Sequence, residues 1–355
     1  MDREKKYIPR LIAWEITRSC HLNCRHCRAG AGSGSYENEL GLEEIFKTMD
    51  SISVFGKPII ILTGGEPMLR SDLNDIISYG DNLGLIMVMS PCGKLLTENK
   101  ARELKGAGLK RISISIDGAS PESHDNFRGV PGAFEDALKG IEAAKRAGLQ
   151  FQINTTVTKH NIHEIEDILE LAIKIGAVAF SPFLLVPAGR GKDLVDMEIS
   201  PRQYENILNW IYQKKQQVHI NLRPTCAPHY FRILREQEKK AGRRVTPENH
   251  GLDAFTKGCM GGQSFAFISH VGMVQICGFL EIGCGNIRES GYDFQNIWET
   301  SKVLLQLRDA DNYHGRCGYC EYRLVCGGCR ARAYGTTGNY LDEEPYCVYQ
   351  PKKKR

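Results

Sequence analysis

Three cysteines stand in one short stretch near the start of the chain, Thr17-Arg18-Ser19-Cys20-His21-Leu22-Asn23-Cys24-Arg25-His26-Cys27. Their spacing is C-x3-C-x2-C, which supplies three thiolates and no obvious fourth. Structural zinc is usually held by four ligands in a closed tetrahedron, so zinc here would have to borrow a side chain such as His21 or His26. Three thiolates on one tight loop instead suit a [4Fe–4S] cluster with one iron left open to a small molecule.

The composition is that of an ordinary globular chain. Its 355 residues favour about two domains, and 42% hydrophobic with 25% charged residues is typical of such domains. A net charge of +4 is too small to indicate a nucleic-acid partner. No run of about 18 apolar residues occurs and no secretory signal follows Met1, so we expect no membrane insertion.

The thirteen cysteines are unevenly placed, with eight of them between Cys259 and Cys347. Disulfide scaffolds are expected in small exported domains rather than in a chain of this length. An odd total with C-x2-C spacing indicates metal ligation in a reducing compartment, and we therefore expect a cytoplasmic protein.

Between the two cysteine-rich ends, apolar runs of strand length alternate with segments of helical period. The expected strands are 11–16, 58–63, 85–90, 111–116, 150–157 and 178–186. The expected helices are 42–54, 72–82, 98–107, 133–147, 162–175 and 201–215. Near-continuous apolar strands alternating with helices predict an α/β fold with a parallel sheet, here a partial (β/α)6 TIM-like barrel. A doubly wound open sheet is the alternative.

Polar and glycine residues follow these strands at the points where each one ends. In a barrel the carboxyl ends of the strands meet on one rim, where function is expected. Gly64-Gly65-Glu66-Pro67 follows the second strand. The glycines allow a close backbone approach, and Glu66 offers a carboxylate suited to a ligand ammonium.

This rim resembles that of the radical S-adenosyl-L-methionine (SAM) superfamily over residues 8 to about 190. The resemblance implies that Cys20, Cys24 and Cys27 hold a [4Fe–4S] cluster whose open iron binds SAM. It further implies a set of SAM-binding residues: Gly64, Gly65 and Glu66 at the amino group, Ser115 and Asp117 near the ribose, and Arg128 or Asn154 at the carboxylate. Pro91-Cys92-Gly93 departs from the more usual Thr-Asn-Gly.

The C-terminal region carries four further thiolates with compact spacing, Cys317, Cys320, Cys326 and Cys347. By type they fit zinc as well as iron. Attached to this barrel, the region resembles the cysteine-rich SPASM domain, which implies an auxiliary [4Fe–4S] cluster on these four. A possible second auxiliary cluster would use Cys259, Cys277 and Cys329, with Cys284 as a further candidate, because the usual additional cysteine near Cys259 is missing.

We divide the chain accordingly into four parts. These are the radical SAM barrel (1–222), a bridging segment (223–256), the SPASM domain (257–350) and a basic tail (351–355).

Three stretches, 11–20, 223–230 and 326–334, resemble a tetrapyrrole-maturing branch of the superfamily, the anaerobic heme b synthases. The resemblance implies oxidative decarboxylation of two propionates of Fe-coproporphyrin III to vinyls. A reductant such as flavodoxin or ferredoxin would be a partner. Arginines suit porphyrin carboxylates, and Cys and His are iron ligands by type, so the substrate candidates are Arg223, Cys226, His229 and Arg232.

Alternatives remain at this point. The chain could be another tetrapyrrole-modifying radical SAM enzyme, a peptide maturase with the same clusters, or a non-enzymatic electron carrier or zinc scaffold.

Overall fold

The structure, a computed structural model, describes residues 7–352 and is built around one ten-stranded sheet. Six strands form parallel neighbours in chain order. They are β1 (Leu11–Thr17), β2 (Ile59–Gly64), β3 (Ile86–Met89), β4 (Arg111–Ser115), β5 (Gln150–Val157) and β6 (Ala179–Leu184). The order of a doubly wound sheet reverses at a switch point, and this one does not. The predicted partial barrel is therefore confirmed, and the open-sheet alternative is wrong.

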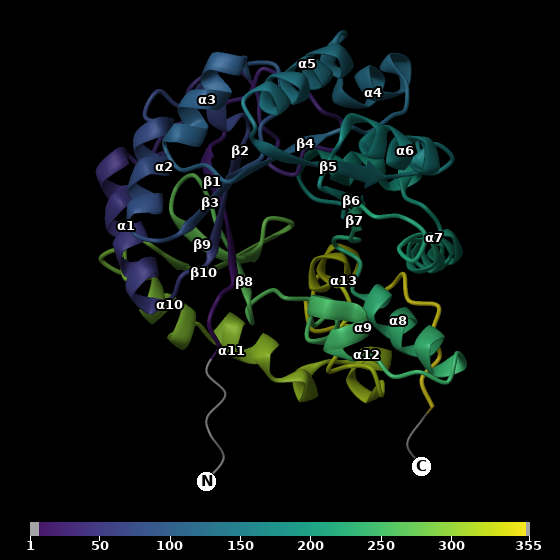
Figure 1. Ribbon diagram of the computed structural model, residues 1–355. Helices are drawn as coiled ribbons and strands as arrows, with labels where there is room; N and C mark the ends of the chain where they lie inside the picture. The colour runs from purple at the N-terminus through teal and green to yellow at the C-terminus, as the bar shows by residue number, and fades with distance from the viewer. Residues whose placement is uncertain (1–6, 353–355) are drawn as a thin grey trace.

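The predicted helices cover the outer side of these strands (Figure 1). They are α1 (Leu42–Phe55), α2 (Leu73–Asn82), α3 (Glu98–Gly106), α5 (Ala133–Arg146), α6 (Ile165–Ile175) and α7 (Pro201–Lys214). In α1, for example, Ile45, Met49 and Ile52 are buried at helical spacing, which is the apolar stripe that docks a helix on a sheet.

One helix of the barrel, α4 (Pro121–Arg128), was not predicted. It buries only Ser123, His124 and Phe127, so its sequence shows no continuous apolar stripe. Its ends are instead set locally: the Ser120 hydroxyl accepts a hydrogen bond from the Ser123 N–H, and Gly129 ends the helix at φ +69°.

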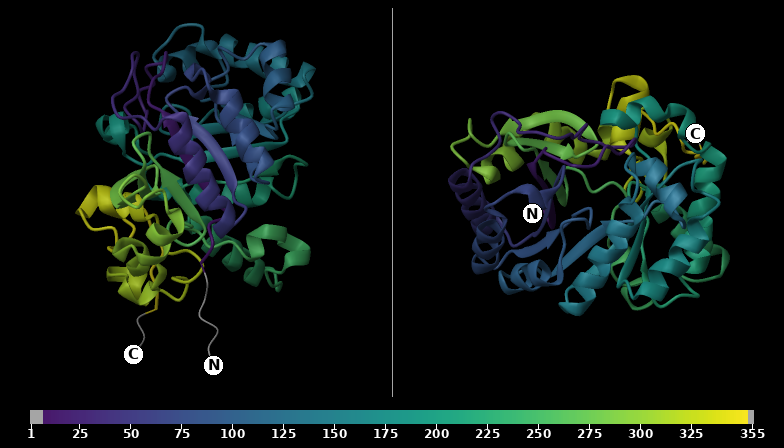
Figure 2. Two further views of the ribbon diagram at one scale, coloured as in Figure 1. Left: turned by 90° about the vertical axis from the view of Figure 1, so that its left-hand side faces the viewer. Right: turned by 90° about the horizontal axis from the view of Figure 1, so that it is seen from above.

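The sheet continues beyond the six βα units on both sides. β7 (Asn221–Leu222) pairs with β6. On the other side, β8 (Phe265–Ile268) runs parallel to β1, although more than 240 residues separate them in sequence. β9 (Met273–Cys277) and β10 (Leu280–Asn286) follow antiparallel. The cysteine-rich region thus extends the barrel sheet, and in the view from above it lies beside the N-terminal segment (Figure 2).

The remaining elements are helices and 3-10 turns that follow or connect these strands. They are α8 (His229–Lys240), α9 (Pro247–His250), α10 (Phe294–Thr300), α11 (Lys302–Arg308), α12 (Gly315–Tyr319), α13 (Arg330–Thr337) and the 3-10 turns η1 (Pro67–Leu69), η2 (Gly189–Met197), η3 (Gly251–Ala254) and η4 (Ala310–Asn312). Among the described residues, no helix combines the length and the apolar character needed to cross a bilayer. The predicted basic tail lies outside the described residues from 353 onward.

Candidate functional site

The three cysteines of the first motif lie on the loop that leaves β1. Cys20 and Cys24 are each only 8% exposed, and Cys27 is half-buried beside them. The Cys20 N–H donates to the Gly32 carbonyl at 2.8 Å, which closes the loop on itself. Burial, together with the nearby Cys24, Cys27 and Glu66, raises the pKa of the Cys20 thiol to about 11, although the Leu22 N–H opposes this shift. Cys20, Cys24 and Cys27 thus lie together on one loop, in the same small apolar cluster.

Arg190 holds this loop from the far side of the barrel. Its Nε donates to the Cys24 carbonyl at 2.9 Å and its Nη1 to the Ala31 carbonyl at 2.7 Å. Its backbone N–H donates to the Cys27 carbonyl at 3.0 Å. Sequence reasoning missed this residue, because its partners lie some 160 residues away and no local pattern marks the contact.

The two glycines after β2 let that strand end press against the start of the cysteine loop. A Cβ on Gly64 would lie 2.1 Å from the Thr17 carbonyl oxygen, and one on Gly65 would lie 2.3 Å from that of Ser19. The N–H groups of Gly65 and Glu66 donate to these two carbonyls at 2.8 and 2.7 Å. The close approach that the sequence predicted is thus made, in this structure, to the cysteine loop.

Glu66 is fully buried next to that loop. One carboxylate oxygen accepts from the Met68 N–H at 3.0 Å and the other from the Cys92 N–H at 2.7 Å. The His21 Nε2 lies 3.2 Å from the Cys92 sulfur. The departure from the family pattern at Cys92 therefore lies in direct contact with both motifs of the rim.

Asp117 and Arg128 form a buried ion pair at 2.5 Å on the same rim. The Arg128 Nη1 also lies 3.6 Å from the Cys24 sulfur. Burial would raise the pKa of Asp117, but the Arg128 charge, together with His26, His124 and the Thr156 N–H, lowers it below its usual value. Arg128 thus connects the predicted ribose-binding carboxylate to a predicted cluster ligand.

The other two predicted SAM residues lie close by. Ser115 and Arg128 line one small hollow together with Leu22 and Cys92. Asn154 pairs in register with Ser115, and its side-chain oxygen accepts from Gln152 at 3.0 Å.

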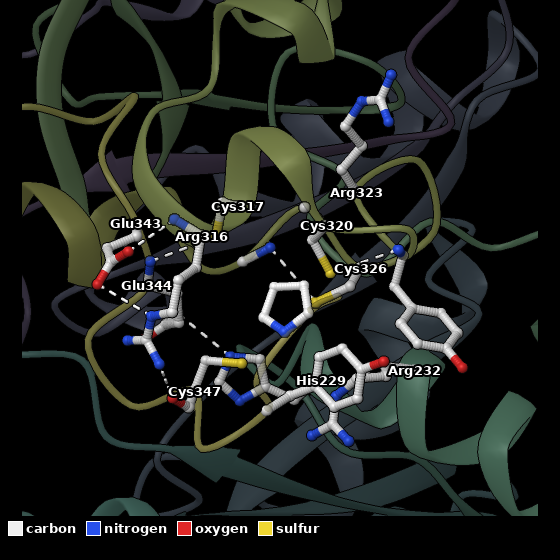
Figure 3. A pocket seen from close by; sticks show the side chains of 15 residues that line it. His229, Arg232, Arg316, Cys317, Cys320, Arg323, Cys326, Glu343, Glu344 and Cys347 are labelled. Atoms are coloured by element: carbon white, nitrogen blue, oxygen red, sulfur yellow. Dashed lines mark hydrogen bonds and ion pairs between the residues drawn. The ribbon is translucent and has the colours of Figure 1, made fainter. Parts of the chain in front are cut away.

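The four predicted auxiliary cysteines line a single cavity. Cys317, Cys320, Cys326 and Cys347 border this hollow together with His229 and Arg232 (Figure 3). Three of the sulfurs have a backbone N–H at 3.4 Å: Glu344 at Cys317, Tyr322 at Cys320 and Gly328 at Cys326. Such N–H donors stabilise thiolates and tune iron–sulfur clusters.

The donor set at this cavity is four cysteine sulfurs, three of them next to a backbone N–H. Thiolates with such donors have the chemistry that an iron–sulfur cluster requires.

The second group of predicted cysteines, Cys259, Cys277 and Cys329, is also brought together. Burial first, and then Cys329 and Cys259, raise the pKa of Cys277. Burial also raises the pKa of Cys329, to about 11, although the Arg332 charge opposes this shift. Cys284 has a different charged neighbour, Arg308.

Of the four predicted substrate residues, His229 and Arg232 line the four-cysteine cavity, whereas Arg223 and Cys226 are not among its lining residues. Arg223 pairs with Asp253 at 3.2 Å. Arg232 pairs with Glu205 and Glu236 at 2.5 and 2.7 Å. His229 is fully buried in the four-cysteine cavity, with both ring nitrogens lacking a hydrogen-bond partner among the described residues.

His229 and Arg232 thus face the auxiliary cysteines. Burial, followed by nearby arginines, lowers the pKa of His229 to about 4 although Glu344 opposes the shift, so the ring is neutral at pH 7.

The sequence of this chain is similar to those of known proteins. The profile of the radical SAM superfamily matches residues 14–172. An AdoMet-dependent heme synthase of Methanosarcina barkeri is 51% identical over 98% of this chain and 98% of the relative. One of Oleidesulfovibrio alaskensis is 51% identical over 97% of this chain and 88% of the relative.

Solved structures share the fold at lower identity. Streptococcus suis SuiB bound to S-adenosylmethionine superimposes with a TM-score of 0.75 at 15% identity, covering 97% of this chain and 78% of that one. The anSMEcpe enzyme with bound AdoMet and peptide gives 0.69 at 18% identity, covering 96% and 94%.

Proposed function

Because this chain belongs to the AdoMet-dependent heme synthase family of the radical SAM superfamily, we propose that it converts Fe-coproporphyrin III into heme b. Two propionates would be decarboxylated oxidatively to vinyl groups. The observation that carries the proposal is the 51% identity to heme synthases along almost the whole chain. Identity to an Fe-coproporphyrin III synthase is 30% and to a pre-heme d1 synthase 28%, so these two activities are less well supported for this chain.

A [4Fe–4S] cluster held by Cys20, Cys24 and Cys27 would give an electron to bound SAM and so supply a 5′-deoxyadenosyl radical. Hydrogen-atom removal from a propionate β-carbon and loss of CO2 leave a vinyl group and one surplus electron. Two rounds of this reaction are needed for each heme.

The chain's own residues would hold SAM at the rim. Glu66 offers a buried carboxylate to the SAM ammonium, since its two present donors are only backbone N–H groups of Met68 and Cys92. Arg128 forms an ion pair with Asp117. Its guanidinium would orient the SAM carboxylate, and its charge would keep Asp117 ionised so that Asp117 can accept a hydrogen bond from a ribose hydroxyl.

The surplus electron cannot stay on the vinyl product, so the reaction requires an electron acceptor. The cavity of Cys317, Cys320, Cys326 and Cys347 offers a redox site of the right donor type. We propose an auxiliary [4Fe–4S] cluster on these four cysteines, and a second on the group that includes Cys259, Cys277 and Cys329. The reductant that supplies the electron for SAM cleavage would be a small carrier such as flavodoxin or ferredoxin.

The proposal is tested by anaerobic incubation of the protein with Fe-coproporphyrin III, SAM and a reductant, followed by mass spectrometry of the porphyrin. Two successive losses of formic acid equivalents (CO2 and two hydrogens), with matching 5′-deoxyadenosine, are expected. A matched incubation with didecarboxysiroheme should leave that tetrapyrrole unchanged. Turnover of didecarboxysiroheme but not of Fe-coproporphyrin III would overturn the proposal.

A further inference from the structure

Cys226 holds a backbone conformation that residues with a side chain rarely adopt. Its φ is +54°, and among the described non-glycine residues only Asn38 and Tyr292 also have positive φ. This conformation is unfavourable for a residue with a Cβ and persists only where the surroundings impose it. Here the Tyr204 hydroxyl and the Arg332 Nη2 both donate to the Cys226 carbonyl, at 3.1 and 3.3 Å.

These contacts bring Cys226 to the second group of cysteines. Arg332 stands on α13, three residues after Cys329. Two residues after Cys226, Pro228 packs so tightly against Gly258 that a Cβ on this glycine would lie 2.7 Å from the Pro228 carbonyl oxygen. Gly258 directly precedes Cys259. The segment carrying Cys226 is therefore in contact with the segments that carry Cys259 and Cys329.

Cys226 is partly buried and packs against the core that contains Cys329. Its pKa is raised first by burial and then by the nearby Cys329, Cys277 and Cys259, with Arg332 opposing. Cys284, the other candidate for a missing fourth ligand, has Arg308 as its charged neighbour and none of these thiols. Four thiols thus converge from β9, the turn before β8, the start of α13 and the bridging segment.

We propose that Cys226 is the fourth ligand of a second auxiliary [4Fe–4S] cluster with Cys259, Cys277 and Cys329. On binding, the Cys226 thiol loses its proton to solvent and its sulfur bonds to the fourth iron. The cluster is then closed, so it exchanges electrons without coordinating substrate, and Cys226 does not bind the porphyrin iron. The inference rests on the proposed function only for the identity of the metal group.

The test compares Cys226→Ala with Cys284→Ala, which removes a partly buried thiol of the same region. Both are made in the wild-type protein and in a Cys20→Ala/Cys24→Ala/Cys27→Ala background that leaves only auxiliary clusters. Iron and acid-labile sulfide are counted after anaerobic purification, and reduced samples are measured by electron paramagnetic resonance with and without imidazole.

Cys226→Ala should lose the iron of one cluster, or else give a spectrum that changes with imidazole because one iron has become open. Cys284→Ala should match its parent in both readouts. A Cys226→Ala variant with the parental iron content and an imidazole-insensitive spectrum would overturn the inference. So would loss of the cluster in Cys284→Ala instead.

A second readout tests the rival role, in which Cys226 binds the porphyrin iron. Fe-coproporphyrin III is titrated into Cys226→Ala and followed by its absorption spectrum. A changed porphyrin spectrum with intact auxiliary clusters would assign Cys226 to the porphyrin iron and refute the cluster role. Since iron counting requires no turnover, its outcome is independent of whether the protein makes heme.

Discussion

The backbone N–H of Cys259 donates a hydrogen bond to the carbonyl oxygen of Cys326 at 3.1 Å. One cysteine of each auxiliary group takes part in this contact, so the two groups are direct neighbours. Glu344 joins them a second time, because its N–H lies 3.4 Å from the Cys317 sulfur while its carboxylate accepts from the Cys329 N–H at 2.6 Å.

The Cys259 group also faces the barrel. Arg28, directly after Cys27, is among the charges acting on Cys277 and would lie 3.1 Å from a Cβ on Gly278. The Cys259 group therefore has Arg28 of the cysteine loop on one side and the Cys317 group on the other. With the proposed clusters bound, this order would favour removal of the surplus electron away from the SAM site.

Replacing Cys20, Cys24 and Cys27 by alanine should abolish 5′-deoxyadenosine formation, because these are the only ligands proposed for the SAM-binding cluster. Iron bound in the C-terminal region should remain. Chromatography of the reaction mixture and iron counting check the two parts. SAM cleavage by the triple variant would show that the assignment is wrong.

Cys320→Ala should still cleave SAM but should form little or no vinyl product, because the electron acceptor on the four-cysteine cavity is lost. The ratio of 5′-deoxyadenosine to decarboxylated porphyrin measures this uncoupling. Zinc instead of iron in the anaerobically purified wild-type cavity would contradict the premise.

Gly65→Ala should prevent the β2 end from docking on the cysteine loop, because the new Cβ would lie 2.3 Å from the Ser19 carbonyl oxygen. We expect strongly reduced iron in the SAM-binding site and no SAM cleavage. Gly106→Ala is the matched control: nothing lies within 4 Å of its Cβ, and alanine at this helical site should stabilise by up to about 1 kcal/mol. Equal iron contents in the two variants would argue against the docking role.

Arg128→Met should destabilise the protein by about 3–5 kcal/mol, because it leaves Asp117 as a buried charge without its partner. Adding Asp117→Asn to this variant should recover most of the loss, since no uncompensated charge then remains. Urea unfolding under anaerobic conditions measures both. A double variant no more stable than Arg128→Met would place the cost elsewhere.

His124 should make stability fall as the pH drops below 6.5. Burial, and then the Arg128 charge, lower its pKa to about 4, whereas the unfolded chain keeps a value near 6.5. The unfolded state then binds the proton first, so unfolding becomes easier by roughly 1 kcal/mol between pH 6.5 and 5.5.

In the folded protein the His124 Nδ1 accepts from the Asp117 N–H at 3.0 Å. His124→Asn keeps an acceptor that does not titrate, so urea unfolding of this variant at pH 7.5 and 5.5 should show a correspondingly smaller loss. Equal losses in both proteins would exclude His124 as the titrating group.

Much of the barrel was predictable because its signals are local. Strands such as Ile59–Gly64 are continuous apolar runs, and α1 carries its apolar stripe within 14 residues. Helix α4 was missed because it is polar and is defined by its caps. The pairing of β8 with β1 was missed because parallel strands carry no sequence mark of which distant strand lies beside them.

The sequence by itself determined the ligand types and their spacing: three cysteines on the loop after β1, a glycine pair with Glu66 after β2, and two cysteine sets near the C-terminus. Short spacing and strand order suffice for this, because neighbouring parallel strands end at the same rim. Only the tertiary structure decided which distant groups meet. Arg190 reaches the cysteine loop, and His229 lies against the auxiliary cysteines. Arg332, on the helix that follows Cys329, donates to the Cys226 carbonyl, because long-range packing, and not local pattern, brings their segments together.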